Sequence, residues 1–238
     1  MKIFIGCSGF YNSSWKNSFY PEKLPSKKWF EYYSTQFNTL EINSSFYRYP
    51  KLQVLQKWVN DSPDDFKFSI KAPRTVTHYR RFLNAEQPLV DFYNLISEGL
   101  NEKLGPVLFQ LPASFTYTPE RLDLIIHALD PHFINVMEFR HTSWMQPEIY
   151  GILEKSGITY CSMSHPSLPD DLVITGSREY IRFHGVPELY KSSYSAEYLS
   201  QWANAIKQER PDQCFIYFNN TITTAAIENA VTLRRLLE

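Results

Sequence analysis

Five short segments of this chain share one pattern: apolar and polar residues alternate, and charged or amide residues gather toward the C-terminal end of each segment. Alternation with a period of two is typical of β-strands, whose successive side chains point to opposite faces. A single strand of this kind turns its polar face to water. Five such strands with polar residues at the same end predict a shared polar centre instead. The segments are residues 39–43, 67–71, 136–140, 180–184 and 216–220.

Strand patterns and helical patterns alternate along the whole chain. Apolar residues recur at helical spacing between strands, as in Trp29, Tyr33 and Phe37, and Thr118 followed by Pro119 is typical of a helix start. Segment 163–177 differs, because it has no helical pattern and contains two prolines, so it predicts an irregular crossover. The predicted strands cover residues 3–8, 39–43, 66–71, 105–110, 135–139, 158–162, 180–184 and 214–218.

Eight strands and seven recognisable helices predict an α/β fold, a single-domain TIM-like (β/α)8 barrel over residues 1–238, with one degenerate crossover between strands six and seven. A doubly wound open sheet is the rival fold. That fold places a Gly-rich turn directly before a helix, whereas Gly6 and Gly9 are followed by a long aromatic loop. No repeat or Gly/Ser linker marks a domain boundary.

Composition excludes several classes of protein. A net charge of −1 gives no global basic field, so nucleic-acid binding is expected to be weak. Cys7, Cys161 and Cys214 stand far apart in predicted strands, a pattern typical of free thiols in a reducing compartment. No apolar run approaches the roughly 20 residues that span a membrane, and the N-terminus lacks a signal-peptide core. We expect a cytoplasmic protein with no membrane partner.

Ordered motifs occur from one end of the chain to the other. They include residues 5–11 (IGCSGFY), 40–47 (LEINSSFY), 105–112 (GPVLFQLP), 138–141 (EFRH), 182–185 (RFHG) and 217–220 (YFNN). Through these motifs the chain resembles the YecE-like family, also called domain of unknown function 72, over essentially its whole length. Phe10 departs from the family pattern, which commonly has Trp there. The resemblance implies a TIM-like barrel and supplies no reaction.

Barrel enzymes place their chemistry at the C-terminal ends of the strands. Two carboxylates and several cations are expected there, and buried charges require partners. Ion pairs that merely close the barrel are one interpretation. The amides on the same rim favour a functional pocket. The candidate residues at these strand ends are Ser8, Glu41, Asn43, Lys71, Gln110, Glu138, Arg140, Arg182, His184, Asn219 and Asn220.

Acid/base hydrolysis is the first chemistry that fits this set. Glu41 and Glu138 would act as the carboxylate pair of a carbohydrate-active hydrolase. Trp15, Tyr47 and Trp144 would stack on sugar rings. Against this interpretation, neighbouring cations lower carboxyl pKa values, which is wrong for a general acid.

Recognition of an anion, most simply a phosphate, is the second chemistry. Lys71, Arg140 and Arg182 would form the clamp, with His78 or His184 as a proton shuttle. The basic loop 74–81 extends the positive charge beyond the mouth.

A metal site is the third chemistry, with Glu41, Glu138 and His184 as ligands. Its signal is weak, because no strand end supplies Asp and three cations compete for the carboxylates. The sequence therefore predicts no metal and no cofactor.

Taken together, the residues favour a metal-independent, hydrolase-like enzyme whose partner is a small, phosphate-bearing ligand. In this hypothesis Glu41 is the general base, and Glu138 orients Arg182 or Lys71. A carbohydrate-active hydrolase and a nucleic-acid or nucleotide-binding module stay open as alternatives. Analogy of fold alone supports neither of them.

Overall fold

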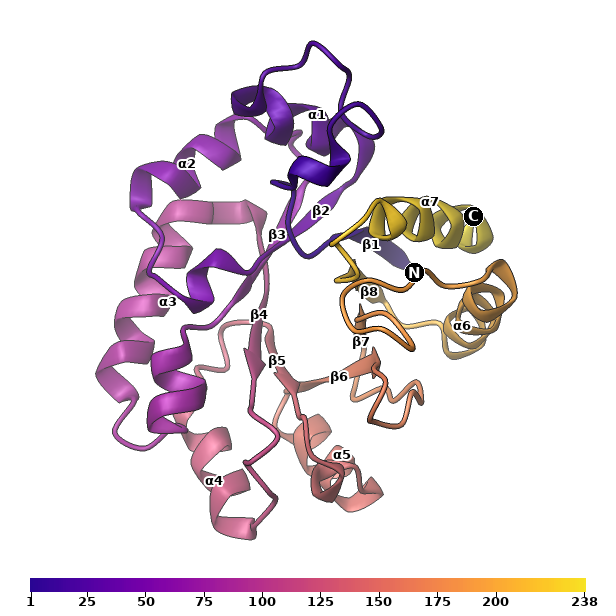
Figure 1. Cartoon of the computed structure of the whole chain (residues 1–238). Helices are drawn as coiled ribbons and strands as arrows, with labels where there is room; N and C mark the ends of the chain where they lie inside the picture. The colour runs from indigo at the N-terminus through magenta and orange to yellow at the C-terminus, as the bar shows by residue number, and fades with distance from the viewer.

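Eight parallel strands form one sheet that curls into a nearly closed barrel, and helices lie outside it (Figure 1). The computed structural model describes all residues, 1–238. The strands are β1 (Lys2–Cys7), β2 (Thr39–Ile42), β3 (Lys67–Lys71), β4 (Leu104–Gln110), β5 (Asn135–Glu138), β6 (Thr159–Ser164), β7 (Arg178–Phe183) and β8 (Gln213–Phe218). The helices are α1 (Trp29–Gln36), α2 (Leu52–Asn60), α3 (Glu86–Leu100), α4 (Pro119–Ala128), α5 (Pro147–Lys155), α6 (Ala196–Glu209) and α7 (Ala225–Leu237).

This architecture confirms the predicted TIM-like barrel and its degenerate crossover. No helix lies between β6 and β7, where the sequence lacks a helical pattern. Thr118 caps α4 through its side chain, with Pro119 in the first turn, as predicted. One expectation was wrong: the basic segment predicted as a loop forms a π-helical turn, Thr75–Arg80. No helix of the structure is long and apolar enough to cross a membrane.

The seam between β1 and β2 is closed by side chains instead of a backbone ladder. The ladder runs from β2 through β3 to β8 and ends on β1. Asn38 bridges the gap by accepting from the Ile5 N–H (3.0 Å) and donating to the Ile3 carbonyl (2.8 Å). A Cβ atom on Gly6 would collide with the Thr39 carbonyl oxygen at this seam, so the close approach requires glycine.

Two layers of apolar side chains hold the barrel together. The larger core of 52 buried residues includes the side chains that pack between strands and helices. A smaller cluster draws one or two residues from each of six strands, which places it inside the barrel. Its members are Phe4, Leu108, Val136, Cys161, Tyr180, Phe215 and Tyr217.

Two tyrosines link this apolar layer to a polar layer nearer the C-terminal ends of the strands. The Tyr217 hydroxyl on β8 lies 2.6 Å from Thr39 Oγ1 and 2.7 Å from Ser69 Oγ, across the barrel. The Tyr180 hydroxyl on β7 donates to Glu41 Oε2 at 2.6 Å. Because side chains alternate along each strand, the next inward positions on β2 and β7 face the mouth.

Candidate active site at the barrel mouth

Arg182 lies at the centre of the mouth and joins two strands on opposite sides of the barrel. Its Nη1 donates to Glu138 Oε2 of β5 at 2.6 Å, and its Nη2 donates to Glu41 Oε1 of β2 at 2.7 Å. Only 1 % of its surface is exposed. The three charged side chains therefore converge as the alternation predicts. Both terminal nitrogens of Arg182 are bonded to the two carboxylates, whereas its Nε is buried without a hydrogen-bond partner.

Glu41 is fully buried, and three donors surround its carboxylate. Besides Arg182, Tyr180 donates to Oε2 at 2.6 Å and Asn43 Nδ2 donates to Oε1 at 3.0 Å. A carboxylate that already accepts three hydrogen bonds has little capacity left for a proton from water or substrate. Glu41 therefore helps to hold the mouth together, and its role as general base stays a prediction.

Glu138 is the second fully buried carboxylate. Arg140 Nε donates to its Oε1 and Arg182 Nη1 to its Oε2. Burial on its own would raise the pKa of Glu138, but the charges of Arg140 and Arg182 hold it well below its usual range. An ionised Glu138 orients both arginines, as predicted for Arg182.

His184 is neutral and positions Arg140. Arg140 Nη2 lies 3.0 Å from His184 Nε2, which must accept, because arginine has no acceptor. The imidazole N–H is then on Nδ1. Asn219 Nδ2 lies 3.0 Å from that nitrogen, so the Asn219 amide has to turn by 180° to present its oxygen to the N–H. Burial, followed by the charges of Arg140 and Arg182, holds the pKa of His184 well below its usual range. A proton shuttle needs a histidine that titrates near neutral pH, and this lowered pKa does not favour such a role, so the catalytic role of His184 stays a prediction.

Lys71 is the one cation of the mouth with no carboxylate partner. Its Nζ donates to Gln110 Oε1 at 2.8 Å and lies 4.2 Å from the centre of the Phe46 ring. Burial, followed by the charge of Arg182, lowers the pKa of Lys71 to about 8. Lys71, Arg140 and Arg182 thus face two carboxylates, and the mouth carries an excess positive charge.

A cavity of about 340 Å³ opens beside this network, and no acidic side chain lines it. Gln110 and Arg140 form the wall toward the barrel. The remaining walls come from Ala113, His165, Ser167, Leu168 and Tyr190. The cavity is therefore positively charged and large enough for a small molecule.

Polar atoms without partners lie on the opposite side of the mouth. Ser8 Oγ and Asn43 Oδ1 are buried and make no hydrogen bond, and Asn43 Nδ2 reaches the Ser8 carbonyl at 3.4 Å. Asn43 and Glu41 also line a second cavity of about 320 Å³. Buried polar atoms without partners are uncommon, and they are found at sites that receive water or a ligand.

Comparison with known proteins places the chain in a family. Residues 4–238 match the family model described as protein of unknown function DUF72. The chain belongs to this family. It is 26 % identical to the UPF0759 protein YunF of Bacillus subtilis over 275 residues, which covers 99 % of this chain and 95 % of YunF. It is 25 % identical to the UPF0759 protein YecE of Escherichia coli K12, over 75 % of this chain and 74 % of YecE.

Solved structures of DUF72 proteins share the whole fold. A DUF72 family protein from Thermotoga maritima superposes with a TM-score of 0.90 and 26 % identity, covering 100 % of this chain and 99 % of the other. A DUF72 family protein from Enterococcus faecalis gives 0.85 and 19 % identity, over 99 % and 95 % of the two chains. The names of these relatives state no activity, so the chemistry of this DUF72 chain rests on its own residues.

Two predicted ligand-binding residues lie elsewhere in the DUF72 barrel. Trp144 is fully buried between the rings of Phe139 and Phe115, and its indole N–H donates to the Phe115 carbonyl at 2.7 Å. Asn220 is also fully buried and donates to Asn229 of α7 and to the Ser192 carbonyl. Both side chains pack and hydrogen-bond inside the protein, away from the mouth, because residues beyond a strand end no longer follow the alternation of the strand.

Tyr47 and His78 lie on the rim instead of in the mouth. Tyr47 is 69 % exposed, and the guanidinium of Arg74 lies 5.8 Å from its ring centre. His78 packs edge-on against Phe46, and burial, followed by the charge of Lys71, lowers its pKa to about 4. Trp15, considered for sugar stacking, is fully buried and donates to the Thr223 carbonyl.

Sequence reasoning missed His165, Ser167 and Tyr190, which line the cavity beside Arg140. The first two belong to the irregular crossover after β6, and Tyr190 belongs to the loop after β7. No periodicity marks such segments. The only usable signal was their place in the chain, directly after strand ends. No group of three or more His, Cys, Asp or Glu side chains is arranged to share a metal ion.

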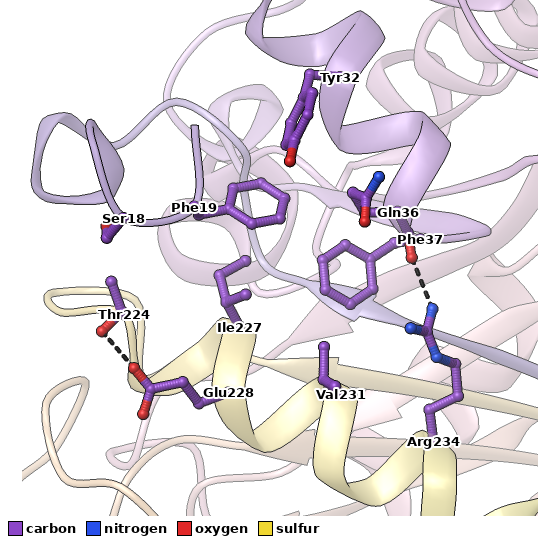
Figure 2. A pocket seen from close by; sticks show the side chains of 10 residues that line it. All are labelled: Ser18, Phe19, Tyr32, Gln36, Phe37, Thr224, Ile227, Glu228, Val231 and Arg234. Carbon is purple, nitrogen blue, oxygen red and sulfur yellow. Dashed lines mark hydrogen bonds between the residues drawn. The ribbon is translucent and has the colours of Figure 1, made fainter. Parts of the chain in front are cut away.

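A further cavity, of about 270 Å³, lies outside the barrel between α1 and α7 (Figure 2). Figure 2 shows Phe19, Phe37 and Ile227 facing into it. The Arg234 guanidinium, which lines this cavity, donates to the Gln36 carbonyl at 2.6 Å. This cavity between helices is lined by one acidic and one basic side chain, Glu228 and Arg234, and lacks the excess charge of the mouth.

Proposed function

We propose that this protein is an enzyme and that its barrel mouth binds a small, phosphate-bearing ligand. The observation that carries this proposal is the charge balance: three cations face two carboxylates, and both carboxylates are already bonded to arginines. The excess charge borders a cavity with no acidic lining. An anion entering there gains attraction without displacing a carboxylate.

Arg140 is the residue that would contact the anion. Its Nε and Nη2 are held by Glu138 and His184, so the guanidinium is fixed in orientation. Nη1 makes no bond within the protein, and 12 % of the side chain is exposed. A fixed guanidinium with a free edge suits phosphate better than a mobile one, because less side-chain entropy is lost on binding.

Hydrolysis by paired carboxylates finds less support. Glu41 and Glu138 are fully buried and bonded to arginine, and the low pKa of Glu138 opposes a role as general acid. We therefore propose phosphate binding without a carboxylate base, and we do not extend the proposal to a carbohydrate-active hydrolase.

The test is thermal unfolding with and without inorganic phosphate, at an ionic strength fixed by chloride. Phosphate at 100 times its dissociation constant should stabilise the parent by about 2.7 kcal/mol. Arg140→Met should abolish this effect, because the contacting group is gone. Arg178→Met is the matched control, because Arg178 is exposed at the N-terminal end of β7, and it should retain the effect. A thermal unfolding midpoint of the parent that does not change with phosphate would refute the proposal.

Arg182→Met separates the anion site from the ion pairs that support it. Removing Arg182 leaves two buried carboxylates short of a partner, so unfolding free energy should fall by about 3–5 kcal/mol. Arg140→Met should cost much less, because Glu138 keeps Arg182. Urea unfolding of both variants checks this order. Equal losses of unfolding free energy in the two variants would mean that Arg140, like Arg182, serves only a structural ion pair.

A further inference from the structure

Lys71 lies in the barrel mouth without an ion-pair partner, unlike a lysine that stabilises a fold through a salt bridge. It is the last residue of β3, at the C-terminal end of the barrel, and its side chain is half-buried. Its only hydrogen bond goes to a neutral amide, Gln110 Oε1, although two carboxylates lie in the same mouth. Arginine takes both of those carboxylates. Gln110 also lines the cavity beside Arg140, so the Lys71 amine is one side chain away from the proposed anion site.

The surroundings of Lys71 raise the fraction of unprotonated amine above that of an ordinary lysine. Arg182 and Arg140 repel the ammonium, whereas Glu138, Glu41 and the face of the Phe46 ring, 4.2 Å from Nζ, attract it. Burial, followed by Arg182, lowers the pKa of Lys71 to about 8. At neutral pH roughly a tenth of the amines are then unprotonated, against about one in a few thousand for an ordinary lysine. Lysines activated in this way act as nucleophiles toward carbonyl carbons.

We propose that Lys71 forms an imine with the carbonyl carbon of a small, phosphate-bearing aldehyde or ketone. This inference rests on the proposed function, because Arg140 would hold the phosphate while Lys71 meets the carbonyl group. A cavity of about 340 Å³ accommodates a short sugar phosphate or a molecule of similar size. Fixing one end of the ligand on Arg140 raises the local concentration of the other end near Lys71.

The step balances without a co-reactant. The Lys71 ammonium sheds a proton, the Nζ lone pair attacks the carbonyl carbon, and the carbonyl π electrons move to oxygen. A second proton then moves from nitrogen to that oxygen and gives the carbinolamine. The carbinolamine hydroxyl takes up the proton that the ammonium shed and leaves as water, while the nitrogen lone pair forms the C=N bond. The nitrogen keeps one hydrogen and the positive charge, so the ammonium and the carbonyl compound give a protonated imine and one water. Nothing is oxidised or reduced.

The experiment traps the imine by reduction. The parent protein is incubated with dihydroxyacetone phosphate and sodium cyanoborohydride, and tryptic peptides are identified by mass spectrometry. Reduction converts the imine to a stable secondary amine, which blocks cleavage after Lys71 and yields peptide 68–74 with the added mass. We expect at least about tenfold more adduct on Lys71 than on Lys67. Lys67 is the matched internal control, because it lies on the same strand and donates to the Glu102 carbonyl at the other end of the barrel.

Two further arms distinguish failure of the imine from failure of the anion site. Neutral dihydroxyacetone should label Lys71 at least about tenfold less than its phosphate, and inorganic phosphate should compete with the labelling. Lys71→Arg should lose the adduct while keeping the thermal stabilisation by phosphate, because the charge is preserved. The peptide map of the parent needs no variant, so a misfolded Lys71→Arg does not weaken the test.

Labelling of Lys71 no stronger than that of Lys67, in a protein that phosphate stabilises, would overturn the imine and leave the anion site. Equal labelling of Lys71 by the neutral and the phosphorylated ketone, with no competition by phosphate, would support the imine and overturn the anion site.

Discussion

Glu138 and Glu179 are both fully buried carboxyl groups, and their surroundings shift their pKa values in opposite directions. Glu138 is bonded to two arginines, whose charges overcome the effect of burial and keep its pKa low. Neither carboxyl oxygen of Glu179 has a hydrogen-bond partner, and burial raises the pKa of Glu179 well above its usual range. The pKa of the same residue type is therefore lowered at the mouth and raised on the outer face of β7, and this difference is measurable.

Glu179→Gln should make the protein more stable at pH 8 and leave it nearly unchanged at pH 4. Glu179 has a raised pKa in the folded state, so its protonated form favours folding below the unfolded-state pKa of about 4.3, and this contribution is lost as pH rises. The parent loses up to about 1.4 kcal/mol per pH unit between the two pKa values, and the neutral amide loses nothing. Urea unfolding at both pH values measures the difference. Glu154→Gln, at an exposed position of α5, is the control, and a Glu179→Gln effect that is equal at pH 4 and pH 8 would contradict the assignment.

β1 and β2 are neighbouring elements with no backbone ladder between them, so side chains carry the closure of the barrel. Tyr33 of α1 places its hydroxyl at this seam, where it accepts from the Cys7 N–H at 2.7 Å and donates to the Thr39 carbonyl at 3.0 Å. The helical spacing of Trp29, Tyr33 and Phe37 in the sequence predicts a helix. The structure adds that the Tyr33 hydroxyl substitutes for a ladder hydrogen bond.

Tyr33→Phe should destabilise the protein by about 1–3 kcal/mol, because the ring still packs while a buried N–H and a buried carbonyl lose their partner. Tyr32→Phe is the matched control on the same helix. The Tyr32 hydroxyl is partly exposed and makes no hydrogen bond within the protein, so its removal should change stability by less than about 0.5 kcal/mol. Denaturant unfolding of the two variants gives the comparison. Similar losses in both would mean that the seam does not depend on the hydroxyl.

At the scale of the whole molecule, the sequence predicts the barrel because two periodicities alternate along the entire chain. It also predicts that Glu41, Glu138 and Arg182 converge, since each occupies an inward position on its strand and the strand ends share one mouth. Alternation says which face a strand residue takes. It does not say how charges pair, so the use of Arg182 by both carboxylates was not predictable.

Alternation does not predict the side-chain directions of residues beyond the strand ends. Trp144 and Asn220 follow strands but turn into the core, because a turn frees the backbone from the alternation. His165 and Tyr190 reach the cavity from irregular segments, where no spacing records their direction. The family resemblance locates motifs but assigns no contact to them. Contacts that depend on loop geometry therefore required the structure.

Nucleic-acid binding is a property of the molecule's overall charge, and here it should be weak and steeply dependent on salt. The net charge is −1, and the local positive charge beyond the mouth comes chiefly from Arg74, Arg80 and Arg81 around the Thr75–Arg80 turn. Arg74 is also held between the rings of Tyr47 and Tyr79, at 5.8 and 5.3 Å. Three phosphate contacts give a slope of log affinity against log salt no steeper than about −2.7 on duplex DNA.

Fluorescence anisotropy of a labelled duplex, titrated across a series of chloride concentrations, measures this slope. Arg80→Ala should reduce its magnitude by about 0.9, because one phosphate contact is lost and Arg80 is exposed. Arg178→Ala should leave the slope unchanged, because Arg178 lies at the N-terminal end of β7, away from the mouth. The positive charge in the mouth itself is enclosed by the barrel and suits a small anion better than a duplex. Tight binding that persists at about 1 M salt, where exposed charges are screened within about 3 Å, would show that contacts other than these arginines carry nucleic-acid recognition.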